Sequence, residues 1–210
     1  LLGAQALSPL ELASIYHTIA ANGFRMPLRV IRRVTDAEGE ELSRYSFTLK
    51  QEVRPEVVHL LQYALQEVGR EGTARSAYSV LPQNLNLAGK TGTSNDQRDS
   101  WFAGFTGDRL AVVWLGRDDN SQLPFTGSGG ALRVWTEFMR REQPEPFIAT
   151  RPSGIEYVWV DEATGLRSDE RCEGSRQLPF LVGTAPEQKV DCGLDTPVRR
   201  SLDWFRNWFN

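Results

Sequence analysis

The chain of 210 residues is poor in the features that mark membrane-spanning and nucleic-acid-binding proteins. Its longest strongly apolar run, residues 110–116, is far shorter than the roughly 20 residues of a membrane-spanning helix. The chain does not open on a basic segment followed by an apolar stretch, so no signal peptide is recognisable. Its net charge is −3 and its arginines are scattered, so we expect no nucleic-acid partner. The hydrophobic fraction of 40% is ordinary for a folded domain.

Cysteine and histidine are equally scarce, with two of each in the whole chain. His17 and His59 stand far from Cys172 and Cys192, so no metal or cofactor is expected. A stretch rich in glycine, proline and aspartate is a poor place to bury free thiols. We therefore predict a Cys172–Cys192 disulfide, worth about 3 kcal/mol on the chain-entropy model, with two buried free thiols as the alternative. A disulfide would indicate an oxidising compartment.

Helix-capping residues and apolar periodicity predict two helices in the first third of the chain. Ser8, Pro9 and Glu11 have the spacing of a capping box, and the helix that they begin ends at residues 22–23. A second helix begins at Pro55 and ends at residues 69–72. Between them, strands are expected over residues 28–35 and toward Phe47, around a turn at residues 36–39. The apolar faces of the two helices are predicted to comprise Leu12, Ile15, Tyr16 and Ile19 in the first, and Val57, Leu60, Leu61, Ala64 and Val68 in the second.

A loop over residues 76–86 leads to three predicted strands, at residues 87–93, 101–105 and 110–115. The turn Gly107-Asp108 should pair the last two strands antiparallel, and the third strand, apolar on both faces, is expected to be a covered central strand. This order of elements predicts an α+β fold in which helices flank an antiparallel sheet. The last helix of this part should bury a stripe formed by Ala131, Val134, Trp135 and Phe138.

The remainder of the chain has the character of a separate appendage. We divide the chain into a domain at residues 1–142, a linker at 143–150 and an appendage at 151–210. The appendage is expected to be small and β-rich, with a strand at 157–160 and a turn at 161–165 before the cysteine pair. Its aromatic end, residues 201–209, is predicted to be a short helix that docks on the protein, with contact to a membrane surface as the alternative.

The sequence Lys90-Thr91-Gly92-Thr93 stands at the end of a predicted strand. A phosphate-binding loop would need its first glycine where the chain has Asn84, and would run into a helix, so it is excluded. The other interpretation is the Lys-Thr-Gly strand of serine acyl-transferases of the penicillin-recognising type. On three residues alone, a surface strand with an accidental match is the better explanation.

These residues would suit a substrate that ends in a carboxylate, because Thr91 and Thr93 supply hydroxyl donors and Lys90 a cation. Side chains alternate along a strand, so Lys90 should face one side and the two threonines the other. Convergence on one ligand would then need local twist, or action through the loop after the strand. Gly92 would let a substrate backbone lie close to the strand. The Thr93 amide would be one oxyanion donor, worth about 3 kcal/mol in such sites.

Several further segments, in a fixed order, make the match far more specific than three residues. They are residues 1–4, 8–13, 21–23, 72–74, 89–94, 99–105 and 113–118. In this combination the chain resembles the class A, or bifunctional, penicillin-binding proteins over residues 1–142.

The resemblance implies a partial transpeptidase fold of the penicillin-binding and β-lactamase type, in a protein that also carries a peptidoglycan glycosyltransferase. It implies a D,D-transpeptidase that cleaves the bond between two terminal D-alanines of a stem peptide and joins the acyl group to an amine of a second stem peptide. The enzyme would use a catalytic serine as its nucleophile, and β-lactams would acylate that serine. Lys90, Thr91, Gly92 and Thr93 would bind substrate and shape the oxyanion hole. The implied location is the periplasmic face of a bacterial inner membrane, with the anchor outside this chain.

The catalytic serine of that family is missing from this sequence. None of the lysines, at positions 50, 90 and 189, has a serine three residues before it, and no asparagine has a serine two residues before it. Ser-x-x-Lys and Ser-x-Asn are therefore both absent. We expect the C-terminal half of a transpeptidase domain plus a tail, inactive alone and completed by the N-terminal half. The alternatives are a serine D,D-carboxypeptidase, a β-lactamase-type enzyme, or a non-catalytic binding module when isolated.

Overall fold

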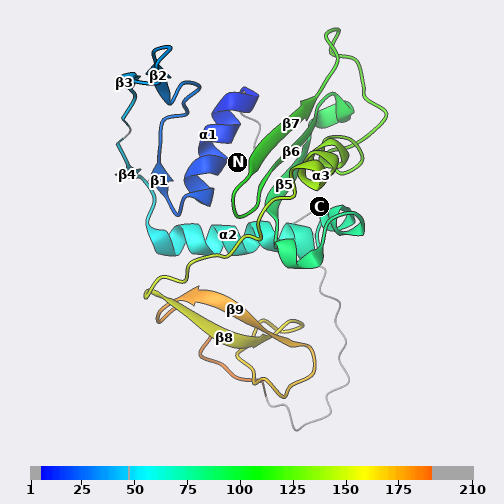
Figure 1. The fold of residues 1–210 in the computed structure, drawn as a ribbon. Helices are drawn as coiled ribbons and strands as arrows, with labels where there is room; N and C mark the ends of the chain where they lie inside the picture. Colours follow the sequence, from blue (N-terminus) through cyan, green and yellow to red (C-terminus); the bar gives the residue numbers. More distant parts are fainter. Residues whose placement is uncertain (1–5, 47, 191–210) are drawn as a thin grey trace.

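Three antiparallel strands form the centre of the fold, which a computed structural model describes over residues 6–46 and 48–190. They pair in the order β5 (Ala88–Thr93), β6 (Ser100–Phe105) and β7 (Leu110–Leu115). Helices lie on both faces of this sheet and beneath it (Figure 1): α1 (Pro9–Ala20), α2 (Pro55–Arg70) and α3 (Ala131–Glu142). The predicted α+β class, with helices around an antiparallel sheet, is confirmed.

Helix α1 begins at the predicted capping box. Ser8 Oγ accepts a hydrogen bond from Glu11 N at 3.3 Å, and Ser8 N donates to Glu11 Oε2 at 2.8 Å. The helix packs against β6 and β7, yet none of its residues is buried by the part of the chain that the structure describes. Ile15, on the predicted apolar face, is 47% exposed. Tyr16 and Ile19 of the same face pack against a core cluster that contains Phe105, so the described residues cover the apolar face of α1 only in part.

Helix α2 lies between the sheet and the appendage (Figure 1). It begins and ends where predicted, but its predicted apolar face is only partly correct: Val68 is buried, whereas Val57 and Leu61 are 40% and 41% exposed. The buried set is shifted by one position and includes Val58 and Gln62. The buried amide of Gln62 is half satisfied: Nε2 donates to Ile19 O of α1 at 2.8 Å, and Oε1 has no hydrogen-bond partner among the described residues.

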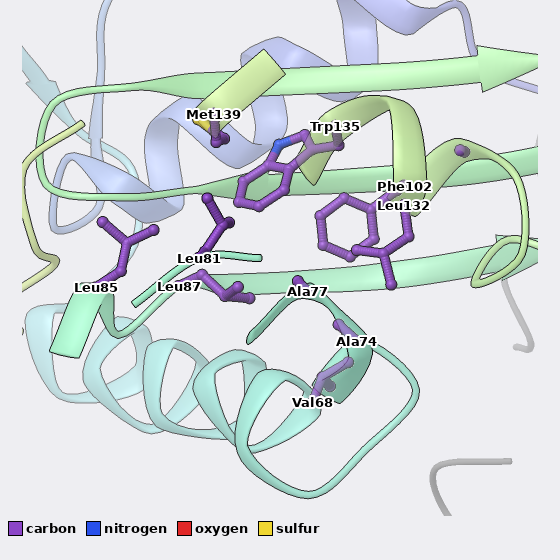
Figure 2. Packing of buried hydrophobic residues seen from close by; sticks show 11 residues of the cluster. Val68, Ala74, Ala77, Leu81, Leu85, Leu87, Phe102, Leu132, Trp135 and Met139 are labelled. Atoms are coloured by element: carbon purple, nitrogen blue, oxygen red, sulfur yellow. The ribbon is translucent and has the colours of Figure 1, made fainter. Parts of the chain in front are cut away.

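The main core lies between β6, α3 and the turns that follow α2 (Figure 2). Trp135 of α3 is fully buried, and its ring packs edge-on against Phe102 of β6 with the centroids 5.0 Å apart. Its indole Nε1 donates to Gly104 O at 3.3 Å. The loop predicted over residues 76–86 contains two 3-10 turns, η1 (Arg75–Ser79) and η2 (Gln83–Leu85), which bring Ala77 and Leu85 into this core.

The predicted stripe on α3 is only half correct. Ala131 and Trp135 are buried as expected, but Val134 and Phe138 are 49% and 42% exposed. The buried stripe is completed by Leu132 and Met139, which flank Trp135 at helical spacing. The sequence alone did not separate the two faces because α3 carries apolar residues on both.

The segment between α1 and α2 forms two small sheets. They pair β1 (Phe24–Arg25) with β4 (Lys50–Gln51), and β2 (Arg33–Thr35) with β3 (Glu41–Arg44). The strand expected over residues 28–35 is wrong for residues 28–32, which have no partner strand in the described chain. The turn at residues 36–39 is present, with Gly39 at φ +90°. Phe47 lies outside the described residues.

Strand β7 is an outer strand of the sheet, where a central strand was expected. The central position belongs to β6, and the ladder described here stops at β7. Residues of β7 are only half-buried, and Trp114 is 45% exposed. An apolar pattern on both faces predicts cover on both faces, and α1 and α3 supply only part of that cover.

Residues 143–150, predicted to be a linker, are bound along the surface of the fold, and we call them the strap. Phe147 of the strap is 6% exposed, and its ring packs edge-on against Phe105 at 5.0 Å between centroids. Its N–H donates to Leu85 O at 2.9 Å. The strap therefore behaves as part of the folded body.

The appendage beyond the strap is a two-stranded antiparallel sheet of β8 (Ile155–Asp161) and β9 (Ser175–Leu181). The first strand includes the predicted one, whereas β9, which runs through Pro179 without a break in register, was not expected. Cys172 is disulfide-bonded, and Cys192 lies outside the described residues, as does the helix predicted at residues 201–209. Within the described ranges no helix has the length and apolarity to span a membrane.

Candidate functional site

The Lys-Thr-Gly sequence occupies the end of β5, with β6 on one side and no strand of the described chain on the other. Thr91 pairs with Phe102, whose ring packs on α3, so Thr91 and Thr93 belong to the α3 face of the sheet. Lys90 shares the opposite face with Ala88, which packs against residues of α1. The structure thus places the cation and the hydroxyls on different faces of one edge strand, as the alternation predicts.

Lys90 is half-buried, and burial lowers the pKa of its ammonium group from its usual value. The Nζ atom donates a hydrogen bond to the carbonyl oxygen of Thr91 at 3.1 Å. That carbonyl belongs to the same edge strand. The ammonium group therefore lies close to the backbone along which a further peptide strand could pair.

Both threonine hydroxyls are held by groups outside β5. Thr91 Oγ1 lies 2.7 Å from Thr73 Oγ1, on the segment between α2 and η1. Thr93 Oγ1 accepts a hydrogen bond from Gly127 N at 2.9 Å. Thr93 is exposed and Thr91 is half-buried, so the Thr93 hydroxyl is the more accessible of the two.

The close approach of Trp101 leaves little room for a side chain at Gly92. A Cβ atom added there would lie 3.1 Å from the Cβ of Trp101 on the paired strand. Gly127 is more constrained, since its added Cβ would lie 2.5 Å from Gly92 O and 2.8 Å from Trp101 O. The loop at Gly127 therefore packs directly on the backbone of β5 and β6.

The loops around the strand are fixed by a buried serine and by an aspartate. Ser100 is fully buried, and its Oγ donates to Thr126 O and accepts from Ala131 N, each at 3.0 Å. Asp99 Oδ1 accepts from Trp114 Nε1 at 2.8 Å, which ties the start of β6 to β7. Ser100 is thus a structural residue that anchors the loop leading into α3.

Sequence reasoning missed the roles of Thr73 and Gly127. Thr73 belongs to residues 72–74, which contribute to the family resemblance, but the pattern says nothing of its contact with Thr91. Gly127 opens a run of glycines, which indicated only a break before α3. Within residues 6–46 and 48–190 no group of three histidine, cysteine, aspartate or glutamate residues is arranged to hold a metal ion.

Comparison with known proteins gives one consistent family. Residues 2–131 match the penicillin binding protein transpeptidase domain. Penicillin-binding protein 1B of Vibrio cholerae is 38% identical over 211 residues, covering 100% of this chain and 26% of that protein. The proteins of the same name from Haemophilus influenzae and Escherichia coli are each 35% identical, covering 96% and 99% of this chain and 26% and 27% of those proteins. The chain therefore spans about a quarter of the length of these relatives.

Solved structures share the fold. Penicillin-binding protein 1A from Haemophilus influenzae matches with a TM-score of 0.80 at 23% identity, covering 90% of this chain and 34% of that chain. The D,D-transpeptidase domain of a peptidoglycan glycosyltransferase from Eggerthella lenta is 27% identical with a TM-score of 0.51, covering 65% of this chain and 33% of that chain. From its cysteine pair and aromatic end, the tail is expected to resemble penicillin-binding protein 1B of Gram-negative bacteria, and the relatives of that name cover 96–100% of this chain.

Proposed function

The chain belongs to the transpeptidase family of penicillin-binding proteins, and from this premise we propose that it is the C-terminal half of a class A D,D-transpeptidase domain. In this proposal residues 1–142 form the half domain, and residues 151–210 form an appendage closed by the Cys172–Cys192 disulfide. The parent protein also carries a peptidoglycan glycosyltransferase. It acts at the periplasmic face of a bacterial inner membrane, through an anchor outside this chain.

The observation that carries the proposal is the arrangement of Lys90, Thr91 and Thr93 along an edge strand. A stem peptide that pairs with β5 as an added strand brings its terminal carboxylate to the two hydroxyls on the α3 face. The ammonium group of Lys90, on the other face, is held at the same strand by its hydrogen bond to Thr91 O, and its charge favours an anionic ligand there. Charge-assisted hydrogen bonds of this kind are about twice as strong as neutral ones. The backbone N–H of Thr93, at the end of the strand, then donates to the oxyanion.

The reaction follows from these positions once a serine is supplied from upstream. The serine oxygen attacks the carbonyl carbon of the penultimate D-alanine, the C–N bond breaks, and the terminal D-alanine leaves with a proton on its amine. An amine of a neighbouring stem peptide then attacks the acyl-enzyme, and the serine recovers its proton. β-Lactams acylate the same serine and stop at the first step.

Three uncovered surfaces support the need for an upstream half. Helix α1 has no buried residue among those described, and strand β7 ends the ladder with half-buried apolar residues. Val57 and Leu61 of α2 are exposed on the predicted apolar face. Exposed apolar side chains on several neighbouring elements are typical of a domain that lacks part of its core.

Two other functions use the same strand. In a D,D-carboxypeptidase or a β-lactamase-type enzyme, water replaces the acceptor amine. The aromatic segment at residues 101–105 and the long tail favour the transpeptidase. The isolated chain, without a nucleophile, acts at most as a non-catalytic binding module.

Labelling with fluorescent penicillin tests the proposal. We expect no covalent label on the 210-residue chain after denaturation, and a labelled band when the upstream residues are present. Label on the chain alone would place the serine within it, contrary to the proposal. If the protein that includes the upstream residues is folded and still takes no label, a penicillin-sensitive transpeptidase is excluded. Products from stem peptides then separate the enzymes, since cross-linked dimers indicate transpeptidation and free D-alanine without dimers indicates hydrolysis.

A further inference from the structure

Two groups outside the Lys-Thr-Gly strand hold the hydroxyls of Thr91 and Thr93. We infer that Thr73 and the backbone amide of Gly127 are positioning residues that aim both hydroxyl protons at the carboxylate of the substrate. The inference rests on the proposed function, because it assigns a role to residues that support the proposed carboxylate site. Neither Thr73 nor Gly127 needs to touch the substrate.

The Gly127 contact fixes the direction of the Thr93 hydroxyl. An amide N–H only donates, so Thr93 Oγ1 is the acceptor of the 2.9 Å hydrogen bond. A hydroxyl carries a single proton, and here that proton is left for another partner. Since Thr93 is exposed, this partner is a ligand or water. Thr93 is therefore preset as a donor, which is the role that a carboxylate requires.

The loop that presents this amide has little freedom to move. A Cβ atom at Gly127 would lie 2.5 Å from Gly92 O and 2.8 Å from Trp101 O, and both are backbone atoms. The loop is also pinned by Ser100, whose buried hydroxyl bonds Thr126 O and Ala131 N. The donor direction of Thr93 is thus built into the packing before any substrate arrives.

The Thr73 contact completes the same arrangement at Thr91. Without ligand, either hydroxyl of the 2.7 Å pair can be the donor. A carboxylate beside Thr91 only accepts, so Thr91 must donate to it and Thr73 must donate to Thr91. Each hydrogen bond in such a chain polarises the next one. Thr73 is held in place by the turn after α2, where Ala74 N donates to Val68 O at 3.0 Å.

The test uses the parent protein, with the upstream half present, and measures the second-order rate constant of acylation by benzylpenicillin. Benzylpenicillin methyl ester, which lacks the anionic carboxylate, serves as the second reagent. Thr73→Val removes the hydroxyl at nearly constant shape, and Thr73→Ser keeps it. We expect Thr73→Val to slow acylation by the free acid about tenfold, and Thr73→Ser to stay within about threefold of the unmodified protein. Acylation by the ester should be unchanged in both variants.

Gly127 has a matched control in its own loop. A Cβ added at Gly129 would meet no atom closer than 3.5 Å, whereas Gly127→Ala must displace backbone. We expect Gly127→Ala to slow acylation by the free acid at least about tenfold, and Gly129→Ala to leave it unchanged. Circular dichroism melts of all variants identify any that fail to fold. If Gly127→Ala fails to fold, the comparison of Thr73→Val with Thr73→Ser still tests the inference.

The possible results separate the two proposals. If the unmodified folded protein is not acylated, the proposed function fails whatever the variants do. If it is acylated and Thr73→Val reacts with penicillin as fast as before, only the role of Thr73 fails. A loss that is equal for the free acid and the ester would overturn the inference, because it would reflect a structural role. Equal losses in Gly127→Ala and Gly129→Ala would overturn the part that concerns Gly127.

Discussion

Arg176 of β9 and Glu67 of α2 form an ion pair where the β8–β9 sheet meets α2, with 2.9 Å between Arg176 Nη1 and Glu67 Oε2. The other carboxylate oxygen of Glu67 bonds Arg70 at 2.8 Å, and the side chain of Glu67 is only 9% exposed. Arg176 Nε also contacts Glu162 Oε1 at 2.8 Å. The appendage is therefore docked on α2 by a shared network of charges.

Replacing Arg176 by methionine should lower the free energy of unfolding by about 2–3 kcal/mol, because Glu67 stays buried with one cation fewer. Urea unfolding followed by circular dichroism measures the change. Arg171 is the matched control, since its side chain is 91% exposed beside Asp169 and Arg171→Met should change stability by less than about 0.5 kcal/mol. Equal effects of the two substitutions would contradict a role for the buried pair.

His59 should make stability depend on pH. Its Nδ1 donates to Thr150 O at 3.0 Å, since a carbonyl only accepts, and its Nε2 accepts from the Tyr157 hydroxyl at 2.8 Å. Burial lowers the pKa of His59 from its usual 6.5, against the opposing effect of the Thr150 hydrogen bond, and the nearby Arg151 lowers it further. The folded chain then binds fewer protons than the unfolded chain between the two pKa values.

The contribution of His59 is thus complete above pH 6.5 and is lost as the pH falls through the lower pKa of the folded state. Urea unfolding at about pH 7.5 and about pH 5.5 should show a larger loss of stability for the unmodified chain than for His59→Gln, which lacks this imidazole and keeps every other titratable group. A loss of the same size in both chains would contradict the prediction.

Truncation on the two faces of α3 should lower the free energy of unfolding by very different amounts. Trp135→Phe removes buried ring volume and the hydrogen bond to Gly104 O, and should cost about 1–3 kcal/mol of unfolding free energy. Val134→Ala, at a position that is 49% exposed, should cost less than about 0.5 kcal/mol. Thermal melts of the two variants decide whether the buried face is the one described. A costly Val134→Ala would instead favour the face expected from the sequence.

Lys90→Met should separate function from stability. Burial disfavours the ammonium form of Lys90, so its loss should leave the free energy of unfolding unchanged or raise it by up to about 1 kcal/mol. In the parent protein, acylation by penicillin should fall about a hundredfold with the loss of the cation. Unfolding and penicillin labelling on the same preparations test both halves. A variant that unfolds more easily yet labels normally would assign Lys90 a structural role.

The predicted disulfide has a direct mass test. With Cys172 and Cys192 paired, the intact chain should be two hydrogens lighter than after reduction, and no thiol should react with iodoacetamide before reduction. Reduction should lower the free energy of unfolding by about 3 kcal/mol on the chain-entropy model. An unreduced chain that takes up two alkyl groups would exclude the pairing.

The elements with local signals could be predicted from the sequence, and those that depend on partners could not. The capping box at Ser8 and Glu11 satisfies its own hydrogen bonds, and α1 begins there. Of the strand expected at residues 28–35, only residues 33–35 form one, because residues 28–32 include apolar residues but have no neighbouring strand in the described chain. For α2 and α3, apolar residues occur on more than one face, so periodicity gave the helices and misplaced their buried sides.

The candidate site divides in the same way. Lys90 to Thr93 form one continuous motif, so a single strand signal located them all and their alternation gave the two faces correctly. Thr73 and Gly127 lie 18 and 34 residues from the threonines that they contact. Such contacts arise from tertiary packing and leave no periodic trace in the sequence. Glycine runs and small polar residues near a recognised motif are the weak signals that remain.

The strap also determines where a mechanical load would be borne. Its backbone makes two hydrogen bonds to the rest of the fold. Gly107 N donates to Glu145 O at 2.8 Å, and Phe147 N donates to Leu85 O at 2.9 Å. A pull that reaches the chain through the appendage first loads contacts with α2, namely the Arg176–Glu67 ion pair and the hydrogen bond of His59 to Thr150 O. It then stretches the two strap bonds, at the β6–β7 turn and at η2. Neither contact lies on the loop at Gly127. Tension applied at the appendage would thus be taken up before it reached the threonines of β5.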